Sequence, residues 1–228
     1  MKTYQAVIFD LDDTLYPEIE YIRSGFRAVA IWAEKEFAIP QGKSVLELTE
    51  LFAQGVRNNT FDRWLNQLGM NLEIIPQLVQ VYREHQPDIH PFKEIPELLS
   101  ALKIKCRLGL LSDGYRTSQI KKLESLKIAS YFDTIVLSDE YGREAWKPNP
   151  WIYELTLQKL GVQSCDAVYV SDNPAKDFLG ARRAQLSTVR LRTPSGIYTN
   201  DAPPDSGYAP DIEVSSHKEL SDYLLSAI

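Results

Sequence analysis

The sequence predicts an α/β protein with a doubly wound parallel sheet and one inserted helical domain. Short, continuously apolar runs rich in β-branched residues recur along the chain, and segments with apolar residues at helical spacing alternate with them. This alternation is typical of a parallel sheet whose two faces are covered by crossover helices. The stretch between the first two runs is far longer than one crossover needs and is helical in pattern, which predicts the insertion.

Five apolar runs are the predicted strands of the sheet. Because their apolar residues are continuous rather than alternating, we expect both faces of each strand to be covered. A short edge strand is also expected at 211–214, after a loop at 193–210 that is rich in Pro, Gly, Ser and Asp and is predicted to be exposed and mobile. The five main runs lie at 6–9, 108–111, 134–137, 167–170 and 188–191.

Helical patterns precede or separate these strands. One helix at 91–103 leads into the second strand. A last helix is expected after Ser216, where the sequence Ser-His-Lys-Glu has the form of a capping box. The repeated strand and helix order favours a doubly wound core. The crossover helices are predicted at 116–126, 150–160 and 174–184.

The insertion is predicted to be a small helical bundle at 17–88. Its apolar residues recur at spacings of three and four, which is the pattern of helices that pack on one another. A proline lies at each end of it, as expected for a domain boundary. Residues 1–16 and 89–228 then form the α/β core domain. Breaks between the helices are expected at Pro40-Gln41-Gly42, Asn58-Asn59 and Gly69.

The composition is that of an ordinary globular protein and argues against several classes of function. Of 228 residues, 44% are hydrophobic and 25% are charged. The net charge of −6 argues against a nucleic-acid partner, because binding a polyanion needs a basic face. No apolar stretch approaches the ~20 residues of a membrane span, and no signal peptide precedes the first strand. We therefore expect a cytoplasmic protein, monomeric or homodimeric, with neither a nucleic acid nor a membrane as partner.

Two carboxylates, Asp10 and Asp12, follow the first predicted strand directly. On an extended strand end they would point to the same side, at the sheet edge where open α/β sheets bind ligands. At an effective dielectric of ~20, two carboxylates ~4 Å apart repel by about 4 kcal/mol, so the pair needs a cation, a proton or solvent. A divalent cation is the functional interpretation. The alternative is a polar turn in which Asp12 or Asp13 caps the following segment.

Polar residues also follow the other predicted strands. Since parallel strands end at one edge of the sheet, these residues are candidates for a single site. Each has an ordinary alternative: a turn serine, a surface lysine, a helix N-cap or a first-turn acid that the helix dipole stabilises. The candidates are Ser112, Asp113 and Gly114 after the second strand, Lys147 after the third, and Asp172, Asn173 and Asp177 after the fourth.

In this order the segments resemble the four motifs of the haloacid dehalogenase-like (HAD) hydrolase superfamily, and the match covers the whole core. The resemblance implies a Rossmann-like core with Asp10 as a nucleophile that becomes a transient aspartyl phosphate. It implies that Asp12 is the general acid and base, a role typically worth ~10²–10⁴-fold, and that its backbone carbonyl binds Mg²⁺. Asp172 would bind Mg²⁺ together with Asp10, and hard oxygen ligands suit that ion.

The same resemblance assigns the other candidates. Ser112, with backbone amides of Asp113 and Gly114, would bind the transferring phosphoryl group, and Lys147 would offset its negative charge. Asp177 would support the metal site or pair with the lysine, and Asn173 would support the same site. One residue departs from the pattern, because Ser171 stands where many members have Gly.

The resemblance implies a magnesium-dependent phosphomonoesterase of a small phosphorylated metabolite, with the helical insertion as a cap of the C1 class. Asp12 disfavours dehalogenases and phosphonatases, which lack this acid. A phosphomutase of the same fold and a catalytically silent binding protein are the alternatives. Five cap residues are candidates for selecting the leaving group, although a solvated helix face is the favoured explanation for each: Glu18, Tyr21, Arg23, Arg57 and Arg63.

Overall fold

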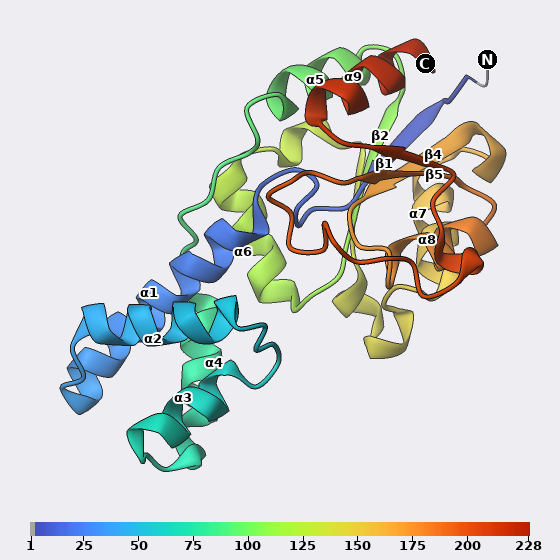
Figure 1. Ribbon diagram of the computed structural model, residues 1–228. Coiled ribbons are helices and arrows are strands. Elements are labelled where there is room, and N and C mark those ends of the chain that lie inside the picture. Colours follow the sequence, from blue (N-terminus) through green and yellow to red (C-terminus); the bar gives the residue numbers. More distant parts are fainter. Residues whose placement is uncertain (1–2) are drawn as a thin grey trace. The chain divides into compact units, whose positions relative to one another are not determined.

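The computed structural model describes residues 3–228 and divides the chain into two compact units (Figure 1). One unit is α/β and consists of the chain up to Glu18 together with His90–Ile228. The other is helical and consists of Ile19–Ile89. The insertion predicted from the sequence has its limits at residues 17 and 88. Along the described residues, no helix combines the length and the apolar composition that crossing a membrane requires.

The α/β unit contains a six-stranded sheet in which every neighbouring pair is parallel, which confirms the predicted fold class. The strand order is β3-β2-β1-β4-β5-β6, so β1 is central and pairs with both β2 and β4. All four residues of β1 are completely buried, as its continuous apolar run predicts. The strands are β1 (Ala6–Phe9), β2 (Arg107–Ser112), β3 (Thr134–Leu137), β4 (Ala167–Ser171), β5 (Ser187–Leu191) and β6 (Ile212–Val214).

The helices of the α/β unit flank this sheet (Figure 1). Local signals fix the limits of α7, because Asn149 accepts a hydrogen bond from the amide of Trp151, Pro150 occupies the first turn, and Gly161 ends the helix. In α9 the side chain of Ser216 accepts from the amide of Glu219, as the capping motif predicts. The helices are α5 (Ile95–Lys103), α6 (Arg116–Leu126), α7 (Pro150–Leu160), α8 (Asp177–Arg183) and α9 (His217–Ser226).

Helix α8 begins later than the predicted range 174–184. The side chain of Asn173 accepts from the amide of Ala175, and its carbonyl accepts from the amide of Asp177, so a turn precedes the helix. Single-turn 3₁₀ segments occupy other connections of the chain. They are Leu72–Ile74, Ala129–Tyr131, Ser138–Tyr141, Arg143–Ala145, Ser164–Asp166 and Ser206–Tyr208.

The helical unit has an aromatic core. The ring of Phe26 lies 6.1–6.5 Å from the rings of Phe52, Phe61 and Tyr82, measured between centroids. Gly25 allows this packing, because a Cβ there would lie 2.3 Å from the Tyr82 ring. The helices are α1 (Glu18–Phe37), α2 (Gln41–Ala53), α3 (Thr60–Leu68) and α4 (Ile75–Glu84).

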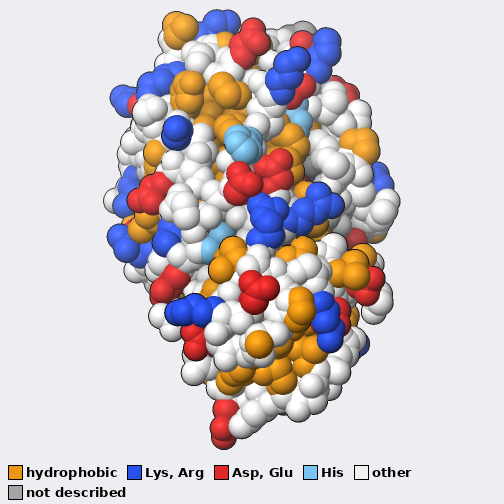
Figure 2. Space-filling model, turned by 90° about the vertical axis from the view of Figure 1, so that its left-hand side faces the viewer, with side chains coloured by type: hydrophobic (Ala, Val, Ile, Leu, Met, Phe, Trp, Pro, Cys, Tyr) orange, Lys and Arg blue, Asp and Glu red, His pale blue; other side chains and the backbone are white. Residues whose placement is uncertain are grey.

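The surface carries both signs of charge. On the face drawn in Figure 2, lysines and arginines are interspersed with acidic residues, and hydrophobic side chains gather in its lower part. Large exposed hydrophobic residues of the helical unit are Ile31, Phe37, Leu46 and Leu72.

Candidate active site

Three buried carboxylates meet at the carboxyl edge of the sheet. Asp10 follows β1 and continues its ladder, because its amide donates to the carbonyl of Val170 at 2.9 Å. Asp172 follows β4, and Asp177 is the first residue of α8. One carboxylate oxygen from each of the three acids lies within 4.8 Å of the others. Such a group of anions is stable only with cations or protons beside it.

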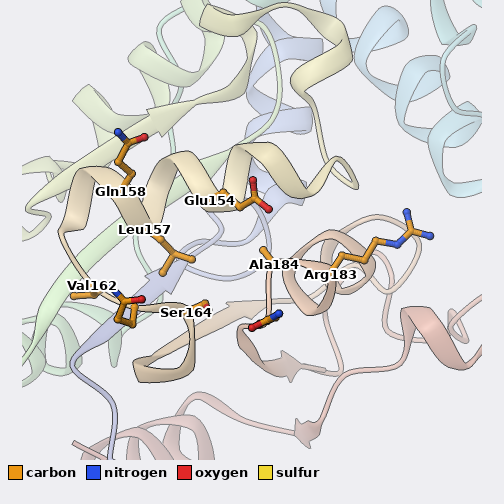
Figure 3. Close-up of a pocket in the computed structure, with 9 residues that line it drawn as sticks. Glu154, Leu157, Gln158, Val162, Ser164, Arg183 and Ala184 are labelled. Atoms are coloured by element: carbon orange, nitrogen blue, oxygen red, sulfur yellow. The ribbon is translucent and has the colours of Figure 1, made fainter.

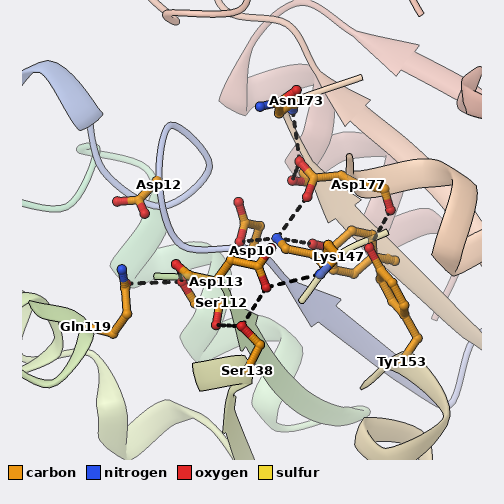
Figure 4. Close-up of polar contacts among 12 residues, drawn as sticks. Asp10, Asp12, Ser112, Asp113, Gln119, Ser138, Lys147, Tyr153, Asn173 and Asp177 are labelled. Atoms are coloured by element: carbon orange, nitrogen blue, oxygen red, sulfur yellow. Dashed lines mark hydrogen bonds and ion pairs between the residues drawn. The ribbon is translucent and has the colours of Figure 1, made fainter. Parts of the chain in front are cut away.

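Lys147 supplies one of these cations (Figure 4). Its Nζ lies 2.7 Å from Oδ1 of Asp10 and 2.8 Å from Oδ1 of Asp177, and it donates to the Tyr169 hydroxyl at 3.0 Å. The lysine side chain is completely buried. Burial alone would lower the pKa of Lys147, but Asp10 and Asp177 raise it well above its ordinary value, so the ammonium is charged. The lysine therefore bridges two of the acids.

Asp177 is held in its ionised form by several donors. Its Oδ2 accepts from the Ser171 hydroxyl at 2.6 Å and from the amide of Asn173 at 3.1 Å. Burial opposes ionisation, but Lys147 and these donors hold the pKa of Asp177 below its ordinary value. The serine that departs from the family pattern thus binds Asp177 directly.

Asp172 differs from the other two acids because, in the described part of the chain, no lysine or arginine forms an ion pair with its carboxylate, whereas Asp10 and Asp177 both pair with Lys147. Among the described residues, its buried Oδ2 has no hydrogen-bond partner. Burial, and then the charges of Asp177 and Asp10, raise the pKa of Asp172 well above its ordinary value. A divalent cation between Asp172 and Asp10 would give the unpaired oxygen of Asp172 a ligand. Its positive charge would also offset the repulsion among the buried carboxylates. The all-oxygen donor set therefore fits a hard cation.

Burial also raises the pKa of Asp10, to about 6, although Lys147 lies within ion-pair distance. The neighbouring Asp177 adds to this rise. A bound cation would act in the opposite direction and favour the ionised carboxylate.

The carboxylate of Asp12 is not one of the three that lie within 4.8 Å of one another, and its contacts are separate from theirs (Figure 4). The chain leaves the extended conformation after Phe9: the Leu15 amide donates to the Leu11 carbonyl at 3.0 Å, and Asp13 has a φ of 50°.

Asp12 instead pairs with Lys122 of α6. The Lys122 Nζ lies 2.7 Å from Oδ1 and 2.9 Å from Oδ2, and the Tyr16 hydroxyl donates to Oδ1. Although burial opposes ionisation, Lys122 and Tyr16 hold the pKa of Asp12 below its ordinary value. Sequence reasoning missed this lysine. The available signal was its place beside Leu123 on the buried face of the predicted helix.

The segment after β2 has the predicted polar residues in defined contacts. The Ser112 hydroxyl donates to Oε1 of Gln119 at 3.1 Å, and both residues are buried. The Asp113 carboxylate accepts from the Ser138 hydroxyl at 2.6 Å. This hydrogen bond links the segment after β2 to the residue that follows β3. Gly114 has a φ of 123°, and a Cβ there would lie 2.3 Å from Nε2 of Gln119. The turn therefore requires glycine.

Asp13 and Arg190 anchor the segment after β5. Asp13 accepts from the amides of Glu18 at 2.8 Å and Ile197 at 2.7 Å, so it caps the start of α1 and also holds the loop. Arg190 donates to the carbonyls of Asp172 at 3.0 Å and Tyr198 at 2.8 Å. Ile197 and Tyr198, in the first part of the loop predicted to be mobile, are thus hydrogen-bonded to Asp13 and Arg190.

Lys176 is a second cation that sequence reasoning missed. It is half-buried, directly before Asp177, and among the described residues no carboxylate lies within ion-pair distance of it. Burial and Lys147 would lower its pKa, but Asp177 and Asp10 raise it above the ordinary value. The lysine is therefore a charged group without an ion-pair partner, close to the acid cluster.

A surface depression of about 340 Å³ lies elsewhere, beside α7 and α8 (Figure 3). Its polar lining residues include Glu154, Gln158 and Arg183, which are exposed. The carboxylate cluster and Lys147 do not line it. The candidate active site is therefore the acid cluster at the sheet edge.

Fold and site together define an α/β protein with a buried acid cluster and a paired lysine at the carboxyl edge of its sheet. The profile of the family described as haloacid dehalogenase-like hydrolase matches residues 7–191. The chain is 34% identical to the glyceraldehyde 3-phosphate phosphatase of Methanopyrus kandleri, over 96% of each chain. It is 30% identical to the protein of that name from Methanothermobacter thermautotrophicus, over 83% of this chain and 86% of that one.

Solved structures show the same fold. The putative HAD-hydrolase YfnB from Bacillus subtilis, in a structure bound to magnesium, matches with a TM-score of 0.72 at 20% identity, over 98% of this chain and 99% of that one. The chain therefore belongs to the haloacid dehalogenase-like hydrolase family, as the motifs in its sequence predict.

Proposed function

We propose that this protein is a magnesium-dependent phosphomonoesterase that hydrolyses a small phosphorylated metabolite. The observation that carries the proposal is the pairing of Asp10 with Lys147 beside Asp172, whose carboxylate has an orphaned oxygen. The names of the relatives, glyceraldehyde 3-phosphate phosphatases, support the same class of reaction and a small, phosphorylated three-carbon substrate.

Asp10 is the proposed nucleophile. One of its carboxylate oxygens attacks phosphorus, and the bond from phosphorus to the leaving oxygen breaks with its electron pair on that oxygen. The negative charge of the bound phosphate group favours the protonated form of Asp12, and in this form Asp12 gives its proton to the leaving oxygen. Water then attacks the aspartyl phosphate and loses a proton to Asp12, and the bond between Asp10 and phosphorus breaks. Inorganic phosphate leaves, and both carboxyl groups return to their initial state.

Asp10, Asp172 and the backbone carbonyl of Asp12 would hold Mg²⁺. The ion would neutralise charge on the transferring phosphoryl group. Lys147 keeps Asp10 in place and adds a positive charge beside it. Its second partner, Asp177, fixes the lysine head from the opposite side.

The Ser112 hydroxyl and the backbone amides of Asp113 and Gly114 are the proposed donors to the phosphoryl oxygens. To bind substrate, the Ser112 hydroxyl gives up its hydrogen bond to Oε1 of Gln119 and donates to a phosphoryl oxygen instead. The new acceptor is charged, whereas the amide oxygen of Gln119 is neutral. Lys176, which has no ion-pair partner among the described residues, adds positive charge for an anionic substrate. We also propose that the helical unit is the cap that selects the substrate, and that the enzyme acts in the cytoplasm.

The test is phosphate release from p-nitrophenyl phosphate and from glyceraldehyde 3-phosphate, with Mg²⁺ and with EDTA. We expect turnover only with the metal and its loss in Asp10→Asn. The matched control is Asp222→Asn, which removes an exposed carboxylate of α9. Metal-independent turnover or an active Asp10→Asn variant would contradict the proposal. Isomerisation of a sugar phosphate, dependent on a bisphosphate, would instead identify a phosphomutase.

A further inference from the structure

Lys122 and Tyr16 enclose the carboxylate of Asp12 from one side. Lys122 comes from α6, and its side chain is 5% exposed. Tyr16 is completely buried. The side chain of Asp12 is 19% exposed, so it is open on the side that the two donors leave free. A buried ammonium is costly unless it is paired, and this one pairs with Asp12 through both carboxylate oxygens.

The two oxygens of Asp12 are not equivalent. Oδ1 accepts from both Lys122 and Tyr16, whereas, among the described residues, Oδ2 accepts from Lys122 alone, at 2.9 Å. An oxygen with two charge-assisted or phenolic donors has little capacity left for a proton. Oδ2 retains a free lone pair. Proton exchange with a ligand is therefore easier at Oδ2.

We propose that Lys122 and Tyr16 are positioning residues that fix Asp12 so that Oδ2 exchanges the proton with the leaving oxygen and then with water. This inference rests on the proposed function and deepens it. Helix α6 begins at Arg116, two residues after the segment Ser112-Asp113-Gly114, so the helix that carries Lys122 is joined to the proposed phosphate donors through Tyr115. Lys122 therefore holds the Asp12 carboxylate in a fixed orientation relative to the residues that would bind the phosphoryl group.

A positioning role and a merely structural role give different kinetics. The ratio kcat/KM reports steps up to departure of the leaving group. An alkoxide leaves poorly without a proton, whereas p-nitrophenolate leaves without one. Misplacing Asp12 should therefore lower kcat/KM for glyceraldehyde 3-phosphate far more than for p-nitrophenyl phosphate. A general loss of structure would lower both equally.

The experiment compares Lys122→Met, Lys122→Arg and Tyr16→Phe, each alone and in an Asp12→Asn background, with Mg²⁺ present. We expect Lys122→Met to lower kcat/KM by ~10–100-fold for glyceraldehyde 3-phosphate and by less than about threefold for p-nitrophenyl phosphate. Lys122→Arg should recover part of the loss. In the Asp12→Asn background Lys122→Met should have no further effect. The control is Lys121→Met, on the same helix, which should match wild type.

Equal losses on both substrates, or a full additional loss in the Asp12→Asn background, would overturn the inference. If Lys122→Met does not fold by circular dichroism, Tyr16→Phe decides by the same criteria, since it keeps the buried ring and removes only the hydroxyl. Wild-type protein that releases phosphate from neither substrate would overturn the proposed function itself. If wild type is active but Lys122→Met and Tyr16→Phe leave the ratio of kcat/KM between the two substrates unchanged, the positioning role alone is overturned.

Discussion

The two units of the chain bury different kinds of side chain. The α/β unit buries acids and lysines in direct contact, as in the pairs of Lys147 with Asp10 and Asp177. The helical unit buries aromatic and aliphatic groups, and its ion pair between Arg27 and Asp88 is exposed. Buried charge is costly and is kept where it serves chemistry, whereas apolar packing tolerates substitution of similar volume. The difference indicates that the reaction is specified in the α/β unit.

The largest expected effect on stability comes from Lys147→Met. It leaves Asp10 and Asp177 buried without their cation, which should lower the free energy of unfolding by about 3–5 kcal/mol. Urea unfolding without metal measures this loss. Adding Asp177→Asn to the variant removes one of the two stranded charges and should restore part of the stability. A loss below about 1 kcal/mol would show that the pairs are not energetically important.

Leu48→Ala makes the corresponding test in the helical unit. Leu48 is completely buried, so its truncation should lower the stability of this unit by about 2–4 kcal/mol. Hydrogen exchange is the measurement, because it separates local from global opening. We expect faster exchange in α1 to α4 and unchanged protection in the strands. Equal loss of protection in the sheet would mean that the two units unfold together.

Magnesium binding should weaken at acid pH. Asp10 has a pKa of about 6 in the metal-free protein, so below that value a proton competes with the ion. We expect an affinity about tenfold lower at pH 5 than at pH 7.5, seen as a smaller magnesium-induced rise in Tm. The variant Asp172→Asn should abolish the rise at both values. A rise in Tm that is independent of pH would contradict the placement of the ion beside Asp10.

The smallest expected effect is on the pH dependence of folding stability, and it comes from His217, outside the acid cluster. Burial lowers its pKa below 6.5, although the carbonyl of Thr14 is 3.3 Å from its Nε2. The unfolded chain therefore binds the proton more readily, and stability should rise with pH between the folded pKa and 6.5. His217→Gln should flatten this part of the curve of stability against pH. An unchanged slope in His217→Gln would contradict the lowered pKa of His217.

The parts of the fold with local signals could be predicted from the sequence. Continuous apolar runs gave β1 and β3 within their observed limits, and proline, asparagine and glycine gave the limits of α7. The convergence of Asp10, Lys147 and Asp172 followed from the parallel sheet, because the carboxyl ends of its strands share one edge.

The parts that depend on distant partners could not be predicted. Asp12 turns to Lys122, 110 positions away, and Asp13 holds the amide of Ile197, 184 positions away. No local pattern encodes either contact. Lys122 also resembles any other charged residue of a helix until the element opposite it is known. The anchored loop escaped prediction for the same reason, since its composition alone is that of a flexible segment.

The central place of β1 in the sheet has a consequence for synthesis on the ribosome. Its two neighbours, β2 and β4, are translated about 100 and 160 residues later, whereas all contacts inside Ile19–Ile89 are available once that stretch has emerged. The helical unit is therefore expected to fold first. Until β4 emerges, one edge of the apolar strand Ala6–Phe9 remains unpaired. We expect chaperones to bind a nascent chain that stalls in this interval.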